Sequence, residues 1–457
     1  GVVVGFLSGS RIGVSGPAAG LITILIAALT TLGSFEGLLV AIVLSGIIQI
    51  IAGFAGLGVL ANYFPSSVIK GMLAAIGLTL ILKEIPHALG YDKDFIGDDA
   101  FFQLDGHNTF SEMMYALNSL QPGAIVISIV SIGILLLFER PYFKKIALFK
   151  ILPGALFAVV IAIVLNTVFQ QFLPSFAVGG KHLVELPVLK SLSEISSVLS
   201  YPDFSFLTNP NVYIVALTLA FVGSLETLLS VDATDKLDPE KHHTPTNREL
   251  KAQGVGNIVS GLIGGLPVTQ VIVRSSANIN AGAKTKSSTI LHGLLLLIAV
   301  LFLPKVINLI PLSCLAAVLI LVGYKLSKVQ LYKQLYHNGY DQFIPFLATI
   351  TGILFTDLLR GIGIGMAFSI FYILRKNFRK NYSISENDKE NNKHIKIVLS
   401  EEVTFLNKGR IKESLDSLPN DSFVTIDGSN CESIDFDVLE LIQEFKLIGS
   451  KERNIQL

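Results

Sequence analysis

Two charged side chains lie in otherwise apolar stretches of this sequence. Glu226 lies within the run Phe221–Ser230, and Arg274 lies in a short apolar segment, where we expect it near the end of a helix. A lone charge at membrane depth is costly, so it is usually paired, neutralised or functional. Ser230 follows Glu226 by four residues and shares its helix face. One interpretation is a structural ion pair between the two charges; the other is that Arg274 attracts an anion while Glu226 takes up a proton.

The position of these charges depends on two short apolar runs that each follow a proline. The runs 18–32 and 268–281 are too short to cross a bilayer alone, and they follow Pro17 and Pro267. Interrupted helices in corresponding positions of two halves of a chain indicate a transporter's binding site. A helix that begins in mid-membrane directs free N–H groups and the positive end of its dipole into a cavity. Two such helix starts predict an anion site with no metal and no cofactor; the alternative is that proline and glycine only kink two packed helices.

The composition is that of a membrane protein. The chain has 457 residues, 35 of them basic and 35 acidic, with 51% hydrophobic and 15% charged residues. A soluble chain carries about 25% charged residues, so a soluble multidomain enzyme is disfavoured, and the lack of a basic excess disfavours a nucleic-acid binder. The sequence shows no Ser/His/Asp or Cys/His arrangement of a nucleophilic enzyme. His242 and His243 have no second ligand pair at metal-site spacing, which favours a solvated loop.

Apolar runs that approach the roughly 20 residues needed to span a bilayer recur along residues 1–380. We expect about thirteen membrane segments, the first cut short where the chain begins. Basic residues in the link 139–150 place that link inside, and acidic residues in 83–121 place that link outside, which leaves the tail in the cytoplasm. The main expected runs are 36–60, 66–82, 122–138, 151–169, 211–231, 289–303, 306–324 and 343–374, the last divided in two near Asp357, with a shorter stretch at 253–263.

Three motifs resemble the SulP family of inorganic-anion transporters. Val14-Ser-Gly-Pro-Ala18 is similar to the start of that family's third helix, the run Gly264–Thr285 to its tenth helix and following turn, and the run Asn62–Gly71 to the entry of its fifth helix. The resemblance implies an all-α polytopic membrane protein with a 7+7 inverted repeat, divided into core and gate domains and followed by a small α/β STAS domain. Set against that fold, we expect the first helix to be missing from this chain. The family also implies a homodimer in the inner or plasma membrane.

The same resemblance implies roles for the site residues. In sodium-coupled members a carboxylate at the position of Glu226 and a hydroxyl at that of Ser230 help to bind the coupling ion, whereas proton-coupled members carry Glu there, as this chain does. We therefore expect proton–anion symport, with sodium as the alternative coupling ion. The residues expected to line the anion pocket are Pro17, Ala18, Ala19, Thr269, Gln270, Val271, Ile272 and Arg274.

Several anions and mechanisms are compatible with these residues. Backbone N–H groups bind any small oxyanion, so they do not separate sulfate from bicarbonate. Sulfate is preferred because proton-coupled relatives often carry it, by movement of the core domain past the gate domain. The alternatives are a bicarbonate transporter or chloride/bicarbonate exchanger, an anion channel or voltage-responsive motor, and a nucleobase permease. An ionisable Glu226 favours coupled transport over a channel.

The end of the chain is richer in charge than the rest. We expect a transmembrane domain over 1–380, a polar linker over 381–393 and an incomplete cytoplasmic STAS domain over 394–457. The resemblance places Asp437 where anti-sigma-factor antagonists carry a phosphorylated Ser, so that switch is not expected here. A regulatory role and a folding or dimer-forming role are both compatible with this tail. Its expected elements are strands at 394–399, 401–406 and 422–427 and helices at 408–418 and 436–448.

Overall fold

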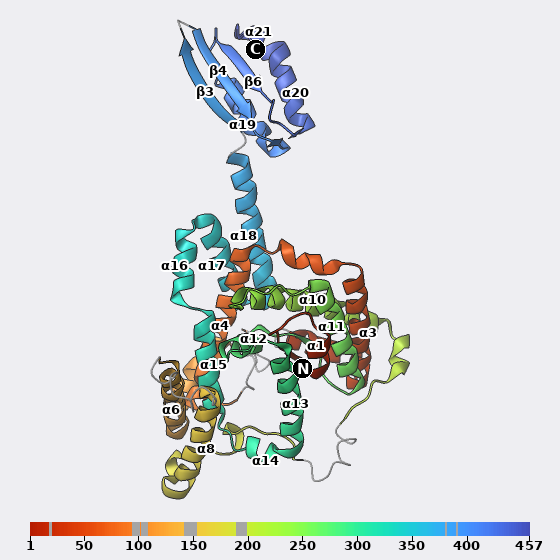
Figure 1. Cartoon of the computed structure of the whole chain (residues 1–457), viewed down its shortest axis with the longest axis vertical. Helices are drawn as coiled ribbons and strands as arrows, with labels where there is room; N and C mark the ends of the chain where they lie inside the picture. The colour runs from red at the N-terminus through yellow and green to blue at the C-terminus, as the bar shows by residue number, and fades with distance from the viewer. Residues whose placement is uncertain are drawn as a thin grey trace. The chain divides into compact units, whose positions relative to one another are not determined.

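The computed structural model of the chain describes residues 1–17, 21–93, 101, 108–140, 153–188, 199–379, 382–389 and 392–457. These residues form two compact units, Gly1–Met366 and Ala367–Leu457. The first unit is almost entirely helical, and the second contains a mixed sheet (Figure 1). Helix α18 (Leu358–Arg379) contains the boundary between them.

Helices dominate the first unit because a backbone in lipid must satisfy its own hydrogen bonds. A 3-10 turn, η2 (Leu57–Tyr63), joins the third and fourth helices. Among the described residues, the helices before α18 are α1 (Val2–Leu7), α2 (Ile22–Leu32), α3 (Phe35–Phe54), α4 (Ser66–Leu89), α5 (Thr109–Asn118), α6 (Pro122–Glu139), α8 (Gly154–Phe172), α10 (Pro210–Leu237), α11 (Thr246–Leu262), α12 (Ile272–Asn280), α13 (Lys286–Phe302), α14 (Pro304–Ile307), α15 (Leu312–Leu326), α16 (Val329–His337) and α17 (Tyr340–Phe355).

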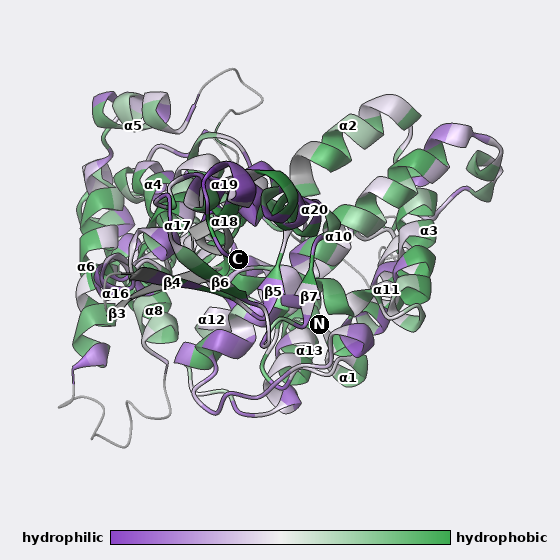
Figure 2. Ribbon diagram, turned by 90° about the horizontal axis from the view of Figure 1, so that it is seen from above, coloured by the Kyte–Doolittle hydropathy of each residue, from purple (hydrophilic) through white to green (hydrophobic). Residues whose placement is uncertain are grey.

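Within the described residues, six helices are long and apolar enough to cross a membrane. They include α3, α6, α8 and α10, and Figure 2 shows hydrophobic residues along much of α3, α6 and α8. The sequence predicted about thirteen segments. That number is larger because it includes apolar runs whose helices are short. In the structure α13 and α17 have 17 and 16 residues, and the runs 18–32 and 268–281 contain helices of only 11 and 9 residues.

The long apolar run 343–374 is divided where the sequence predicted. Helix α17 ends at Phe355 and α18 begins at Leu358, on either side of Asp357. The Asp357 carboxylate accepts a hydrogen bond from the backbone N–H of Arg360 at 2.9 Å. An aspartate at this position caps the first turn of a helix. The charge near the middle of the run therefore starts a second helix.

Glycine contacts hold α3 against α11 and α4 against α15. A Cβ on Gly254 would lie 2.5 Å from the carbonyl oxygen of Gly46, and a Cβ on Gly46 would lie 2.5 Å from that of Gly254. Gly77 of α4 and Gly323 of α15 show the same reciprocal approach, also at 2.5 Å. Small residues allow membrane helices to pack backbone to backbone. Each pair of helices therefore forms one tightly packed body.

In the second unit a three-stranded sheet packs against helices. Its elements are β3 (Tyr382–Lys389), β4 (Asn392–Leu399), β5 (Glu402–Val403), α19 (Lys408–Asp416), β6 (Phe423–Asp427), β7 (Ser433–Ile434), α20 (Phe436–Glu444) and α21 (Ser450–Glu452). Strand β4 lies between β3, which is antiparallel to it, and β6, which is parallel to it. Ile395, Ile397 and Val424 of the sheet pack in one core with Ile411 of α19 and Val438 of α20.

The expected linker over 381–393 differs from the structure. Most of it is strand β3, which is followed by the start of β4. The prediction of a linker rested on polarity, but β3 lies at the edge of the sheet, where polar and charged residues are ordinary. The expected strand at 401–406 is only two residues long, as β5. The other expected strands and helices are present with shifted ends.

Candidate functional site

The two interrupted segments meet as a two-stranded antiparallel ladder. Strand β1 (Ser15–Pro17) pairs with β2 (Val268–Gln270), with Gly16 opposite Thr269 and Pro17 opposite Val268. The alternative of two kinked, packed helices is wrong here, because the backbone at both places is extended. Proline disfavours the helical conformation at the residue before it and has no N–H to donate.

Hydrogen bonds extend this ladder into the start of α12. The N–H of Val271 donates to the carbonyl of Val14 at 2.9 Å. The N–H of Val14 donates to Oγ of Ser275 at 3.0 Å, and this hydroxyl donates to the carbonyl of Val271 at 2.8 Å. Non-helical backbone at membrane depth requires such partners. These hydrogen bonds therefore hold β1, β2 and the start of α12 together.

A short helix follows each strand of the ladder. Helix α12 begins at Ile272, directly after its N-cap Val271, and α2 begins at Ile22. The first N–H groups of a helix have no acceptor within it, and partial positive charge gathers there. Two helix starts that follow one ladder are suited to binding an anion. Ala18 and Ala19, which we predicted to line the pocket, lie outside the described residues.

Arg274 lies in the first turn of α12, so the expectation that it lies near the end of this helix is wrong. The apolar run begins as strand β2, and the helix itself starts only two residues before Arg274. The guanidinium lies beside Gly16, where an added Cβ would come within 3.0 Å of Cζ. No carboxylate of the described residues forms an ion pair with Arg274. An Arg274–Glu226 ion pair is thus not formed in this part of the chain.

Glu226 and Ser230 lie one turn apart on α10. Both side chains are buried, with 9% and 5% of their surface exposed. The next residue, Thr227, accepts a hydrogen bond at 3.4 Å from the N–H of Gln270 in β2. Helix α10 therefore contacts the ladder at the residue next to the buried Glu226. Its role in binding a coupling ion stays a prediction.

The predicted pocket residues of the second segment differ in the hydrogen bonds and contacts of their side chains. Thr269 is fully buried, and its Oγ1 has no hydrogen-bond partner among the residues that the structure describes. Gln270 is also buried, but its Nε2 donates to Oγ1 of Thr234 on α10 at 3.1 Å. Ile272 packs in the hydrophobic core with Leu229. Gln270 thus braces β2 against α10, and Thr269 has the side chain best placed to accept a further partner.

Three buried polar residues of α11 were not predicted from the sequence. Glu249, Gln253 and Asn257 are 0%, 0% and 2% exposed. Their spacing of four residues places them on one helix face. Polar residues repeated at this spacing, from just before the apolar stretch 253–263 into it, are the signal that could have identified them.

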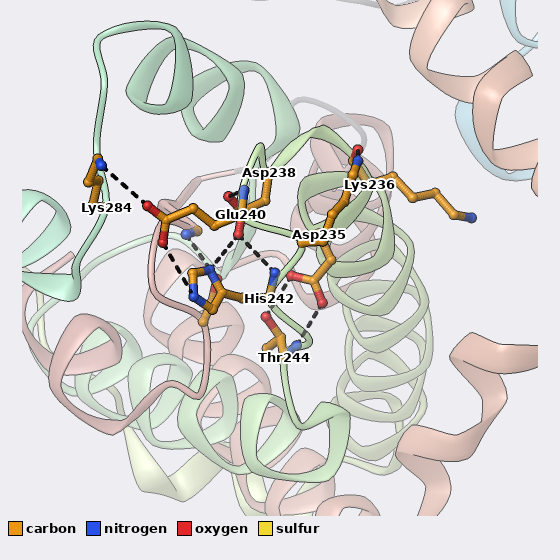
Figure 3. Close-up of polar contacts among 10 residues, drawn as sticks. Asp235, Lys236, Asp238, Glu240, His242, Thr244 and Lys284 are labelled. Atoms are coloured by element: carbon orange, nitrogen blue, oxygen red, sulfur yellow. Dashed lines mark hydrogen bonds and ion pairs between the residues drawn. The ribbon is translucent and has the colours of Figure 1, made fainter.

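The link between α10 and α11 is held by its own ion pairs (Figure 3). Nδ1 of His242 lies 2.8 Å from the Asp238 carboxylate, and Nε2 of His242 lies 3.5 Å from that of Glu240. Glu240 also pairs with Lys284, in the turn after α12, at 3.3 Å. Burial acts to raise the pKa of Asp238, but hydrogen bonds from the N–H of Glu240 and from His242 outweigh it and hold that pKa below its ordinary value.

Comparison with known proteins gives a consistent family. Residues 1–349 match the sulfate permease family. The chain is 28% identical over 377 residues to "Putative sulfate transporter YvdB" of Bacillus subtilis (strain 168), a match that covers 82% of this chain and 66% of YvdB. It is 25% identical over 359 residues to the bicarbonate transporter BicA of Synechocystis, with 77% of this chain and 58% of BicA covered. The chain thus spans somewhat less than two thirds of these two relatives.

Solved structures share the fold. The transmembrane domain of a cyanobacterial bicarbonate transporter BicA matches with a TM-score of 0.52 at 20% identity, covering 81% of this chain and 88% of that domain. The murine anion transporter Slc26a9 in its inward-facing state matches with a TM-score of 0.67 at 15% identity, covering 100% of this chain and 78% of that one. The expected mostly helical membrane architecture, with a small sheet near the end of the chain, is confirmed.

Proposed function

This chain belongs to the sulfate permease family, and we propose that it carries a small inorganic oxyanion across a membrane by secondary active transport. The observation that supports this most is the ladder between β1 and β2, with the Arg274 guanidinium beside Gly16. A fixed cation and the helix starts that follow the two strands would supply positive potential near the ladder. An anion bound there would be held by charge and backbone donors together.

Sulfate is the anion that we propose first. YvdB is named for sulfate, and the chain is similar to it over most of its own length. Bicarbonate is the second candidate, because BicA is named for bicarbonate and shares the fold of the first unit. Both are small oxyanions, and donors from helix starts would bind either.

We propose that a proton on Glu226 is coupled to the anion. A buried carboxylate is costly at membrane depth unless its charge is neutralised. Protonation of Glu226 while the anion is beside Arg274 would remove one charge from the site that has to move. Sodium held by Glu226 and Ser230 is the alternative, and it would neutralise the same carboxylate.

The packing of the helices supports transport by movement of one body past another. Helices α3 and α11 are joined by Gly46 and Gly254, and α4 and α15 by Gly77 and Gly323. The ladder lies beside α10 and α11 and would move with them. Transport of this kind, in which the site travels with one helix group, fits a fold with interrupted helices at its centre.

We further propose that the second unit contains a STAS domain on the cytoplasmic side of the inner or plasma membrane, in a homodimer. The parallel pair of β4 and β6, connected through α19, supports an α/β domain of that kind. The mass of the purified full chain in detergent tests the dimer. A monomer mass would contradict it.

The direct test is reconstitution of the full chain in liposomes. Uptake of labelled sulfate, and of bicarbonate in parallel, is measured at several pH values with and without a sodium gradient. We expect accumulation that rises with an inward proton gradient and does not require sodium. Strict sodium dependence without a pH effect would overturn proton coupling, and no flux of either anion would overturn the proposed function.

Two variants test the roles of Glu226 and Arg274 in transport. We expect Glu226→Gln to abolish accumulation driven by a proton gradient and Arg274→Ala to abolish accumulation by loss of anion binding, with both proteins folded. Arg360→Ala is the matched control, because Arg360 pairs only locally with Asp357 at 3.2 Å. Uptake equal to that of the control in both variants would return Glu226 and Arg274 to a structural role.

A further inference from the structure

The buried face of α11 carries a polar residue at every fourth position. Glu249, Gln253 and Asn257 lie one turn apart and are almost completely inaccessible. Burying a polar group without a partner costs free energy, so partners for these side chains are expected inside the protein. Each of the three contacts one of the interrupted segments or the residues that lead into it.

The first of them, Glu249, holds the chain before β1. Oγ of Ser8 donates to the Glu249 carboxylate, and Nζ of Lys286 donates to the backbone carbonyl of Ser8. Nε2 of Gln253 donates to Oε1 of Glu249 at 2.9 Å. The carboxylate is therefore held from two sides and is joined to the next polar residue of the helix.

Gln253 continues this chain of contacts to β1 itself. The same Nε2 donates to Oγ of Ser15 at 2.6 Å. Ser15 is the first residue of β1 and lies opposite Gln270 in the ladder. One amide group thus links the buried carboxylate of α11 to the first strand.

Asn257 holds the second strand in the same way. Its Oδ1 accepts from the N–H of Val268 at 2.6 Å, and its Nδ2 donates to the carbonyl of Val268 at 3.1 Å. Nδ2 also donates to Oε1 of Gln49 on α3 at 2.7 Å. Val268 lies opposite Pro17, which has no N–H to donate. The Asn257 amide therefore supplies the strand-like partner that the proline does not.

We propose that Glu249, Gln253 and Asn257, the α11 polar ladder, fix the separation and register of β1 and β2 and thereby set the affinity of the anion site. The inference rests on the proposed function. These are positioning residues, because they act through Ser15 and Val268, whose neighbours Gly16 and Thr269 adjoin Arg274 and the proposed pocket. All three lie on one helix, so both strands are tied to one rigid element, and a shift of about 1 Å in such a frame weakens binding strongly.

The test uses two substitutions that remove the same hydrogen bond. Gln253→Leu and Ser15→Ala are made singly and together, and labelled sulfate uptake is measured in proteoliposomes. Loss of one buried hydrogen bond is worth about 1 kcal/mol, so we expect Ser15→Ala to raise KM about fivefold. Gln253→Leu also loses the bond to Glu249, so we expect it to raise KM at least as much. The double variant is expected to raise KM no further than Gln253→Leu alone, because Ser15→Ala removes a contact that Gln253→Leu has already removed. We expect kcat to stay within about twofold in all three.

A second pair of substitutions tests the other strand. Asn257→Leu removes all three hydrogen bonds of the amide, and we expect KM to rise at least about tenfold. Asn257→Asp keeps an acceptor for the N–H of Val268 but loses both donations, so we expect an intermediate KM. Lys251→Leu is the control on the same helix, because its ammonium lies over the Phe54 ring, 4.6 Å from the centroid, and we expect it to leave KM unchanged.

The outcomes separate this inference from the proposed function. Two results would overturn the proposed role of the α11 polar ladder. One is a KM in the Gln253→Leu/Ser15→Ala double variant that rises by the product of the two single effects. The other is a lower kcat at unchanged KM in the variants of Ser15, Gln253 and Asn257. If Arg274→Ala abolishes sulfate accumulation while the variants of Ser15, Gln253 and Asn257 leave KM unchanged, only the role of the α11 polar ladder is wrong. If neither Arg274→Ala nor any variant of Ser15, Gln253 or Asn257 changes sulfate uptake, both the proposed anion site and the proposed role of the α11 polar ladder are wrong. Ser15→Ala removes a single hydroxyl and is expected to fold, and thermal unfolding of each variant in detergent checks this.

Discussion

The guanidinium of Arg274 lies against the Cα of Gly16, across the strand pair that joins the two interrupted segments of the chain. Gly16 leaves room for a bulky cation at a place where any other residue would put a Cβ. The arginine is thereby held beside the extended backbone and near the start of its own helix. Positive charge and backbone donors are thereby brought close together.

Gly16→Ala is therefore expected to weaken anion binding. The added methyl group would come within 3.0 Å of Cζ of Arg274, so the guanidinium has to move. We expect KM for sulfate to rise about tenfold, which corresponds to about 1.4 kcal/mol of lost binding. Gly133→Ala in α6 is the matched control, because a Cβ there meets no atom within 4 Å. Equal KM values in the two variants would show that the position of Arg274 is unimportant for binding.

Thr269→Val tests the buried hydroxyl of β2 that we predicted to line the anion pocket. Its Oγ1 has no hydrogen-bond partner among the described residues, so removing it should cost little stability. If this hydroxyl donates to the anion, KM rises about fivefold, the value of one hydrogen bond. Thr218→Val is the control, since that hydroxyl only bonds the carbonyl of Ile214 on its own helix. An unchanged KM with an unchanged unfolding temperature would remove Thr269 from the site.

Gly254→Ala tests the packing of α3 against α11. The new Cβ would lie 2.5 Å from the carbonyl oxygen of Gly46, so the two helices must separate. Overpacking of this kind costs about 1–3 kcal/mol. We expect a lower unfolding temperature in detergent, measured by intrinsic fluorescence or light scattering. Gly363→Ala, where a Cβ meets open space, should leave that temperature unchanged, and equal loss in both variants would contradict a specific contact.

Asp238→Asn tests the link between α10 and α11. Hydrogen bonds hold the pKa of Asp238 below its ordinary value, so its contribution to stability is present above the ordinary carboxyl pKa of about 3.9 and is lost as pH falls through the lower folded value. We expect Asp238→Asn to lower the unfolding temperature at pH 7 and 5. The difference from the unmodified protein should shrink below about pH 4.

The control for this pH series is Glu240→Gln. The Glu240–Lys284 pair is largely exposed, with 45% and 75% of the two side chains accessible, and exposed pairs contribute little. We expect only a small change in unfolding temperature. A constant difference between Asp238→Asn and the unmodified protein down to pH 3 would show that the hydrogen bonds of this carboxylate do not stabilise the link.

The charged and proline residues of the site could be predicted from local sequence, but the strand pair that positions them could not. Pro17, Pro267, Glu226 and Arg274 are conspicuous because each breaks an apolar pattern. That the proline segments form a pair of strands depends on hydrogen bonds between residues far apart in the chain, which no local period reveals. The same applies to the contact of Arg274 with Gly16.

The position of Arg274 within its helix shows why segment ends are hard to predict. We predicted residues 268–281 as one short apolar run, yet the first part is strand and the second part is helix. The change is set by the partners β1 and Asn257. In the second unit the polarity of β3 likewise led us to predict a linker. Strand β3 lies at the edge of its sheet, where a strand can be more polar than a central strand.

The pairing of β1 with β2 also bears on how the protein is made. During synthesis, β1 enters the membrane long before β2 exists, and its extended backbone then lacks the partner that the finished fold supplies. Contacts between such distant residues form late, because closing a long loop is entropically slow. A nascent chain that stops before residue 268 therefore carries an unsatisfied strand edge at membrane depth, and we expect such truncated products to fold poorly.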